Sequence, residues 1–122
     1  MISLARVYNL NHRAGGEYFL VERLWPRGIR KDALKIDAWV KEAAPSHELR
    51  RWFGHAPQRW QEFKRRYFAE LEAKPEAWQG LAKAARKGNI FLLYSSHDQT
   101  HNNAVALKDY LERKLGSDRR VA

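Results

Sequence analysis

Residues 89–95, NIFLLYS, decide the fold of this chain. The five side chains from Ile90 to Tyr94 are all apolar or aromatic, with no polar residue between them. A run of this length is too short to span a membrane, and its lack of alternation indicates a strand that is buried on both faces. Residues 18–24, YFLVERL, form a second run of this kind, apolar as far as Val21. Such strands are typical of the parallel sheet of an α/β domain.

Apolar residues at helical spacing dominate much of the remaining chain. The clearest stripe is Trp60, Phe63, Tyr67 and Leu71, which predicts a helix over 57–74. Ser46 and Gly54 are typical cap residues for a helix between them. The other predicted elements are a strand over 3–9, a loop over 10–17, and helices over 37–44 (beginning at Asp37), 75–88 and 100–115.

These elements predict one α/β domain over residues 1–115 with three α/β/α layers and a small, mostly parallel sheet. Residues 18–24 and 89–95 are expected to be neighbouring central strands, and residues 116–122 a frayed C-terminal tail. A chain of 122 residues fits a single domain.

Composition narrows the class of protein. The chain has no cysteine, which excludes disulfides, zinc ribbons and thiolate catalysis. No apolar run reaches the roughly 18 residues of a membrane span, and the N-terminal stretch MISLARVYNL carries Arg6 and lacks a signal-peptide cleavage site. We therefore expect a cytoplasmic protein.

The net charge of +9 is concentrated in two windows. Residues 23–31 hold four basic side chains and no acidic one, and residues 50–66 hold six basic side chains against Glu62. Together the two windows account for the whole net charge. A concentrated positive field favours anionic partners, either a small phosphate-bearing molecule or a nucleic acid.

The first window, RLWPRGIRK, directly follows a predicted strand. Ligands of open α/β sheets gather outside the carboxyl ends of the strands, and arginine forks suit phosphate and carboxylate groups. We therefore predict an anion-binding site at the end of strand 18–24, formed by Arg23, Trp25, Arg27, Gly28 and Lys31. The alternative is a turn set by its proline and glycine, with Trp25 packed on the core and the arginines in water.

The loop SSHDQTHNN, residues 95–103, follows the other central strand and is expected to form the opposite wall of the same pocket. Ser95 and Asn102 are predicted to line it, and Asp98 is the candidate proton-handling group for acid–base or hydrolytic chemistry on a nucleotide-like substrate. Capping of the following helix is the alternative role for Asp98 and Asn102. His97 and His101 lie four residues apart, but HDQTH departs from the zinc-protease motif, so no metal site is predicted and no cofactor is assigned.

Other motifs leave the activity open. The chain has neither a glycine-rich dinucleotide fingerprint nor a P-loop, and Ser95 and Ser96 do not lie in a nucleophile elbow. The basic residues within 59–66, together with 23–31, support an alternative function as a nucleic-acid-binding module that grips phosphates. A solvated helix face, partly neutralised by Glu62 and Glu70, explains the same residues.

Four stretches resemble the YeaO-like branch of the domain-of-unknown-function 488 family. They are LVERLWPRG, DAWVKEAAPSHELRRWFGH, RWQEFKRRYFAEL and LLYSSHDQTHNNAVALKDYL, in order between about residues 18 and 112. The resemblance implies a compact three-layer α/β domain and no particular activity. Where the family often has Val-Asp-Arg, this chain has Glu22, and where members of the wider family often carry a cysteine, it has Ser95-Ser96, so thiol chemistry is not carried over.

Overall fold

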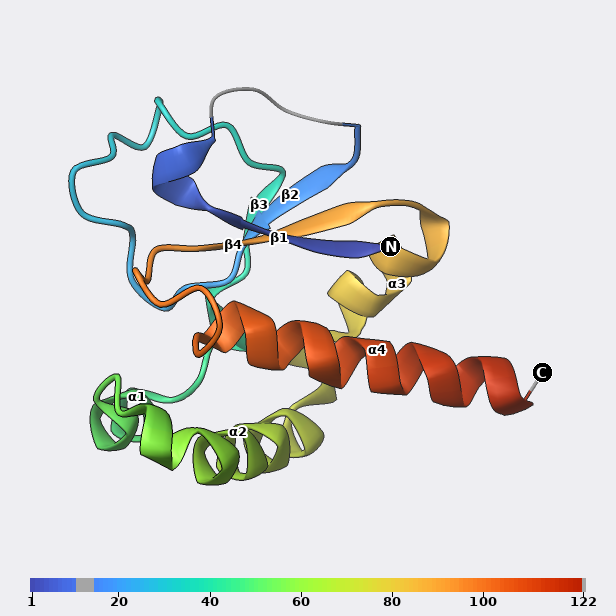
Figure 1. Cartoon of the computed structure of the whole chain (residues 1–122). Coiled ribbons are helices and arrows are strands. Elements are labelled where there is room, and N and C mark those ends of the chain that lie inside the picture. Colours follow the sequence, from blue (N-terminus) through green and yellow to red (C-terminus); the bar gives the residue numbers. More distant parts are fainter. Residues whose placement is uncertain (11–14, 122) are drawn as a thin grey trace.

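A four-stranded parallel sheet forms the centre of the molecule (Figure 1). The computed structural model describes the backbone of residues 1–10 and 15–121, and the side chains of these residues as far as 116. The strands lie in the order β1-β4-β2-β3, with bounds β1 Ile2–Arg6, β2 Glu17–Leu20, β3 Ala38–Trp39 and β4 Ile90–Tyr94. The prediction that the two apolar runs are neighbouring central strands is confirmed.

The α-helices of the described chain are α1 His47–Phe53, α2 Trp60–Ala73, α3 Gln79–Lys87 and α4 Asn103–Val121. Short 3-10 turns occur at Val7–Asn9, Lys41–Ala43, Pro57–Arg59 and Pro75–Ala77. The predicted caps of α1 are confirmed, because the Ser46 side chain accepts a hydrogen bond from the Leu49 N–H and Gly54 adopts the left-handed conformation, with φ of 53°.

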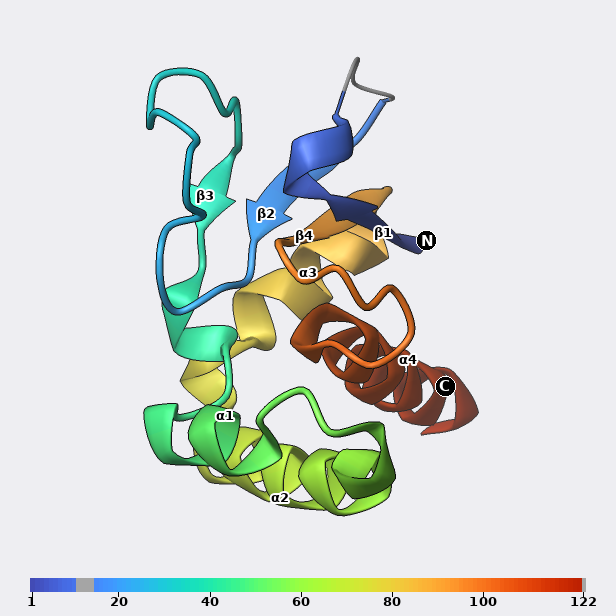
Figure 2. The same cartoon turned by 60° about the vertical axis from the view of Figure 1, so that its left-hand side comes forward.

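The helices pack on one face of the sheet, which is therefore covered differently on its two sides (Figures 1 and 2). Phe19 and Leu92 share one apolar cluster with residues from all four helices. Leu20 and Leu93 face the other way, into a second cluster closed by the 3-10 turn Val7–Asn9 and the segment 22–37. Both faces of the central strands are buried, as their sequences predict, but the layer opposite the α-helices consists of irregular backbone and a 3-10 turn.

The helix predicted over 37–44 is wrong. Residues Ala38–Trp39 form β3, and a 3-10 turn follows at Lys41–Ala43. The Asp37 carboxylate accepts a hydrogen bond from the Tyr18 N–H at 2.6 Å, and the Val40 N–H donates to the Leu20 carbonyl at 2.8 Å. Pairing with the edge of β2 therefore overrides the local helical preference of this segment.

Several predicted boundaries also shift. β2 ends at Leu20 instead of residue 24, and α4 begins at Asn103 and continues to Val121, through the segment expected to fray. Residues 11–14 of the predicted loop 10–17, and residue 122, lie outside the described part. No helix in the described chain is long and apolar enough to cross a membrane.

Candidate functional site at the carboxyl ends of the strands

Two adjoining cavities open where β1, β2 and β4 end. The cavity that we call the inner chamber has a volume of about 670 Å³ and reaches Pro45, Phe53 and Phe63. The outer chamber, of about 700 Å³, reaches Tyr8, Leu24 and Trp25. Six residues line both chambers, and we call them the junction: Glu22, Arg27, Arg50, His55, Ser95 and His97.

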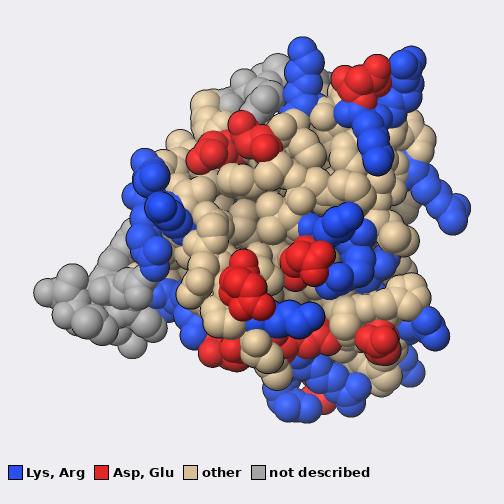
Figure 3. Space-filling model, turned by 180° about the vertical axis from the view of Figure 1, so that it is seen from behind, with Lys and Arg blue, Asp and Glu red and all other residues tan. Residues whose placement is uncertain are grey.

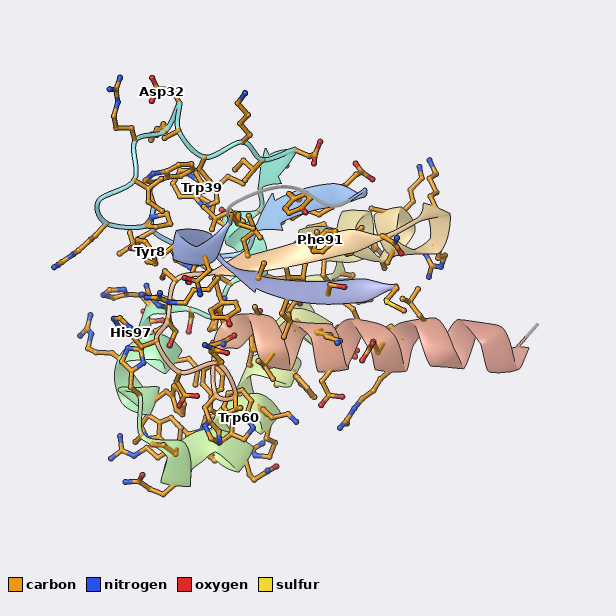
Figure 4. The ribbon with its side chains drawn as sticks, turned by 45° about the horizontal axis from the view of Figure 1, so that its top comes forward. Tyr8, Asp32, Trp39, Trp60, Phe91 and His97 are labelled. Atoms are coloured by element: carbon orange, nitrogen blue, oxygen red, sulfur yellow. The ribbon has the colours of Figure 1, made fainter. Side chains whose placement is uncertain are left out.

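The elements that frame these chambers come from distant parts of the sequence. Tyr8 follows β1 and His97 follows β4, and Figure 4 shows both at the same end of the sheet, with Trp60 in the helical layer below. Since all strands are parallel, their carboxyl ends meet at one edge. The cavities thus lie where α/β sheets place their ligands.

Two arginines of the junction carry guanidinium groups without a protein partner. Arg27 lies in the loop after β2, where its backbone carbonyl accepts a hydrogen bond from the Tyr8 hydroxyl at 2.7 Å. Arg50 lies on α1 and is half-buried. Within the described chain, neither guanidinium makes a hydrogen bond, an ion pair or a ring contact to the protein. Both are available to an anion from solution.

A carboxylate and a hydroxyl meet at the same junction. Glu22 Oε1 accepts hydrogen bonds from the Ser95 N–H at 2.7 Å and from the Ser95 hydroxyl at 2.9 Å. Glu22 therefore holds the end of β4 against the end of β2. Because the Ser95 hydroxyl donates its hydrogen bond to this carboxylate, Ser95 presents mainly its hydroxyl oxygen, as an acceptor, to the cavities.

Asp98 lies in the inner chamber, where it organises the loop before α4. Its Oδ1 accepts from the N–H groups of Thr100 and His101, both at 2.9 Å, and from the Thr100 hydroxyl at 3.0 Å. These hydrogen bonds lower the pKa of Asp98 from its ordinary 3.8 to about 2. A carboxylate with so low a pKa is a poor proton acceptor near neutral pH. Asp98 holds the loop before α4 rather than capping the helix, since its partners Thr100 and His101 precede Asn103.

Asn102 plays the matching role at the start of α4. It is buried, its side-chain oxygen accepts from the Val105 N–H at 3.0 Å, and its amide donates to the Asp98 carbonyl at 2.8 Å. The next residue, Asn103, donates to the Val21 carbonyl at 2.5 Å and fixes the helix start to the end of β2. Asn102 and Asp98 line the same chamber as Arg27, so the structure brings these three predicted residues together.

The two histidines of this loop have different partners. His97 Nδ1 lies 3.2 Å from a guanidinium nitrogen of Arg6, which also donates to the Ser96 carbonyl. His101 Nδ1 lies 3.1 Å from Asp98 Oδ2, and its ring packs edge-on against Trp60. Among the described residues no group of three or more metal-binding side chains comes together.

Four of the five predicted ligand residues in the first basic window, all except Arg27, have structural roles. They are Arg23, Trp25, Gly28 and Lys31. Arg23 donates to the carbonyls of Ala44 at 2.8 Å and Pro45 at 3.2 Å, so its guanidinium joins the end of β2 to the start of α1. The residues that line the two chambers do not include Arg23, Gly28 or Lys31. Their binding role stays a prediction.

The remaining members of that window form a packed turn. The Trp25 indole N–H donates to the Ile29 carbonyl at 2.7 Å, and its ring meets Trp39 edge-on at 5.4 Å. Gly28, with φ of 77°, provides the left-handed residue of this turn. The Lys31 ammonium lies 5.7 Å from the Trp39 ring centroid. Trp25 alone of these three lines the outer chamber.

The basic residues within 59–66, at the start of α2, are partly neutralised within the protein. Glu62 forms ion pairs with Arg65 at 2.6 Å and Arg66 at 2.7 Å, and the Lys64 ammonium lies 2.8 Å from Asp109. Arg59 donates to the Trp52 carbonyl and covers the Trp52 ring. Figure 3 shows basic and acidic side chains interleaved over the lower part of its face. These contacts favour the solvated-face interpretation of the helix.

Sequence reasoning missed Arg50, His55 and Tyr8 as site residues. Arg50 belongs to the second basic window, but its position on α1 beside the strand ends depends on tertiary packing. His55 has φ of 57°, unusual for a residue other than glycine, and lies at the junction. A His directly after a helix-ending Gly was the available signal, and it is a weak one.

Comparison with known sequences identifies the family of this α/β domain. A family sequence model described as "Inactive DUF488-N3 subclade" matches residues 1–121. The chain therefore belongs to the domain-of-unknown-function 488 family, within a subclade described as inactive, and the resemblance seen in its motifs is confirmed.

Individual relatives agree with this assignment. The "Uncharacterized protein YeaO" of Escherichia coli (strain K12) is 41% identical over 110 residues, covering 90% of this chain and 96% of that protein. The "Uncharacterized protein Rv3073c" of Mycobacterium tuberculosis (strain ATCC 25618 / H37Rv) is 47% identical over 70 residues, covering 57% of this chain and 59% of that protein. No solved structure matches this chain.

Proposed function

We propose that this protein binds a small anionic, phosphate-bearing ligand in the two chambers at the strand carboxyl ends. The observation that carries the proposal is the pair of guanidinium groups of Arg27 and Arg50, which line both chambers and have no partner in the described chain. Guanidinium forks bind phosphate and carboxylate groups bidentately. Ser95 and Asn102 complete the polar wall of the inner chamber.

Binding without acid–base chemistry is the form of the proposal that the site favours. Asp98 was the predicted proton-handling group, and its pKa of about 2 leaves it ionised and committed to its own loop. The description of the subclade as inactive points the same way. Catalysis by Asp98 stays a prediction from sequence.

A thermal-shift titration with inorganic phosphate and sulfate tests the proposal. Wild type is compared with Arg27→Gln and Arg50→Gln, and Arg30→Gln serves as the matched control because Arg30 lies in the same loop, is exposed and pairs with Asp32 at 3.0 Å. A ligand at 100 times its dissociation constant stabilises the protein by about 2.7 kcal/mol. We expect both junction variants to lose most of this gain and the control to keep it. Equal shifts in all four proteins would refute the proposal.

A further inference from the structure

The two chambers are each large enough for a separate chemical group. Volumes of about 670 and 700 Å³ both fall within the roughly 300–1,000 Å³ of small-molecule sites. A free phosphate ion between Arg27 and Arg50 would leave both chambers unfilled. The site therefore has room for a ligand that extends from the junction in two directions.

Apolar side chains line each chamber away from the junction. Phe53 and Phe63 contribute to the inner chamber, and Tyr8, Leu24 and Trp25 to the outer one. Tyr8 is 42% exposed and Leu24 is 63% exposed. Met1 is the one other exposed large apolar residue in the described chain. Tyr8 and Leu24 thus offer exposed apolar surface at the outer chamber, beside the junction.

The charge of the lining selects the charge of the ligand. Arg6, Arg27 and Arg50 stand against Glu22 and Asp98, which leaves one positive charge when the histidines are neutral. A phosphodiester carries one negative charge, whereas a phosphate monoester carries about two near neutral pH. Glu22 lies at the junction itself and adds repulsion for a doubly charged group. This balance favours a diester.

From these features we infer that the ligand is a phosphodiester joining two nucleosides. Its phosphate binds Arg27 and Arg50 at the junction, and one nucleoside occupies each chamber. Flat bases stack on aromatic rings with little dependence on sequence. The outer chamber offers the half-buried Trp25 and the exposed Tyr8, whose ring centroid lies 4.7 Å from the Arg6 guanidinium. The inference rests on the proposed anion site and adds the class of ligand that the site accepts.

Nuclear magnetic resonance titration of the whole chain distinguishes a phosphodiester site from a site for a simple anion. The probes are a nucleoside monophosphate, a dinucleoside monophosphate and a short single-stranded oligonucleotide, with the amides of Asn102 and Leu24 reporting on the inner and outer chambers. We expect the dinucleoside monophosphate to shift both amides. Its affinity should exceed that of the nucleoside monophosphate at least about fivefold, the gain from one further stacked base.

The exposed Leu24 offers a variant that leaves the junction intact. Leu24→Ser should lower the affinity for the dinucleoside monophosphate, whereas inorganic phosphate, which binds the junction alone, should stabilise this variant as it stabilises wild type. Tyr8→Phe, which keeps its ring, should retain most of the affinity gain. If the oligonucleotide binds more tightly than the dinucleoside monophosphate, the natural ligand is a phosphodiester within a single-stranded nucleic acid. If the two bind equally, the natural ligand is a free dinucleotide. Either result supports the inference.

Two other outcomes refute different claims. Equal affinity for the mononucleoside and dinucleoside ligands, or shifts confined to one chamber, would overturn the phosphodiester inference and leave the anion site standing. Absence of any binding by the three probes, together with no stabilisation by phosphate or sulfate, would overturn both.

Discussion

Replacing Arg23 by methionine tests whether this arginine is structural. Its guanidinium donates to the carbonyls of Ala44 and Pro45, and the side chain is 30% exposed. Hydrogen bonds from a charged donor contribute about 1.5–3 kcal/mol each, and partial exposure lowers this. We expect Arg23→Met to reduce the free energy of unfolding by about 2–4 kcal/mol. For a domain of this size that corresponds to a fall in Tm of about 6–12 °C.

Urea unfolding followed by the fluorescence of the five tryptophans measures this loss. Arg30→Met is the matched control, since its side chain is 84% exposed and its ion pair with Asp32 contributes little. A phosphate titration of the same variants gives the second readout. Unchanged stability of Arg23→Met with lost phosphate binding would refute the structural role and restore Arg23 to the ligand site.

Three further predictions address the loop, the last helix and the junction. Asp98→Ala should lower the free energy of unfolding by about 1–2 kcal/mol at neutral pH. Because the folded pKa of Asp98 lies below its ordinary 3.8, at about 2, this loss should persist above pH 4 and disappear as the pH falls toward 2. A loss of stability that does not change with pH would contradict this prediction. Gly116→Ala should raise stability by about 0.5–1 kcal/mol and increase helical circular dichroism, since α4 continues through this position; no change in either would support the frayed tail. Glu22→Gln keeps an oxygen that can accept from Ser95 and removes a negative charge from the junction, so phosphate affinity measured by calorimetry should rise by about fivefold, and weaker binding would show that the carboxylate itself supports the site.

The sheet was predictable because its central strands are buried on both faces. A short continuous apolar run such as Ile90–Tyr94 is typical of a parallel strand covered on both faces. Caps such as Ser46 and Gly54 act within a single turn. The segment 37–44 was not predictable by the same reasoning. This segment forms hydrogen bonds with β2, about twenty residues earlier in the chain, and the sequence of residues 37–44 alone does not indicate that pairing.

The candidate site, too, was predictable from the sequence only in part. Topology alone placed Arg27, Ser95, Asp98 and Asn102 at one sheet edge, and all four line the inner chamber. Which cations face the cavity could not be derived, because it depends on what each guanidinium can reach. Arg23 finds two carbonyls at the start of α1, whereas Arg27 finds no acceptor in the described chain and remains available.

The distribution of partners within the site separates binding from catalysis. A proton-transferring residue needs a pKa near the working pH and a free position next to the substrate. Here both carboxylates are engaged, Glu22 by Ser95 and Asp98 by the loop before α4, and the low pKa of Asp98 follows from that engagement. Three junction side chains have no protein partner in the described chain: the imidazole of His55 and the guanidiniums of Arg27 and Arg50. The two guanidiniums cannot lose a proton near neutral pH. The site thus retains two guanidiniums that can hold an anion, while both of its carboxylates are used to build the walls.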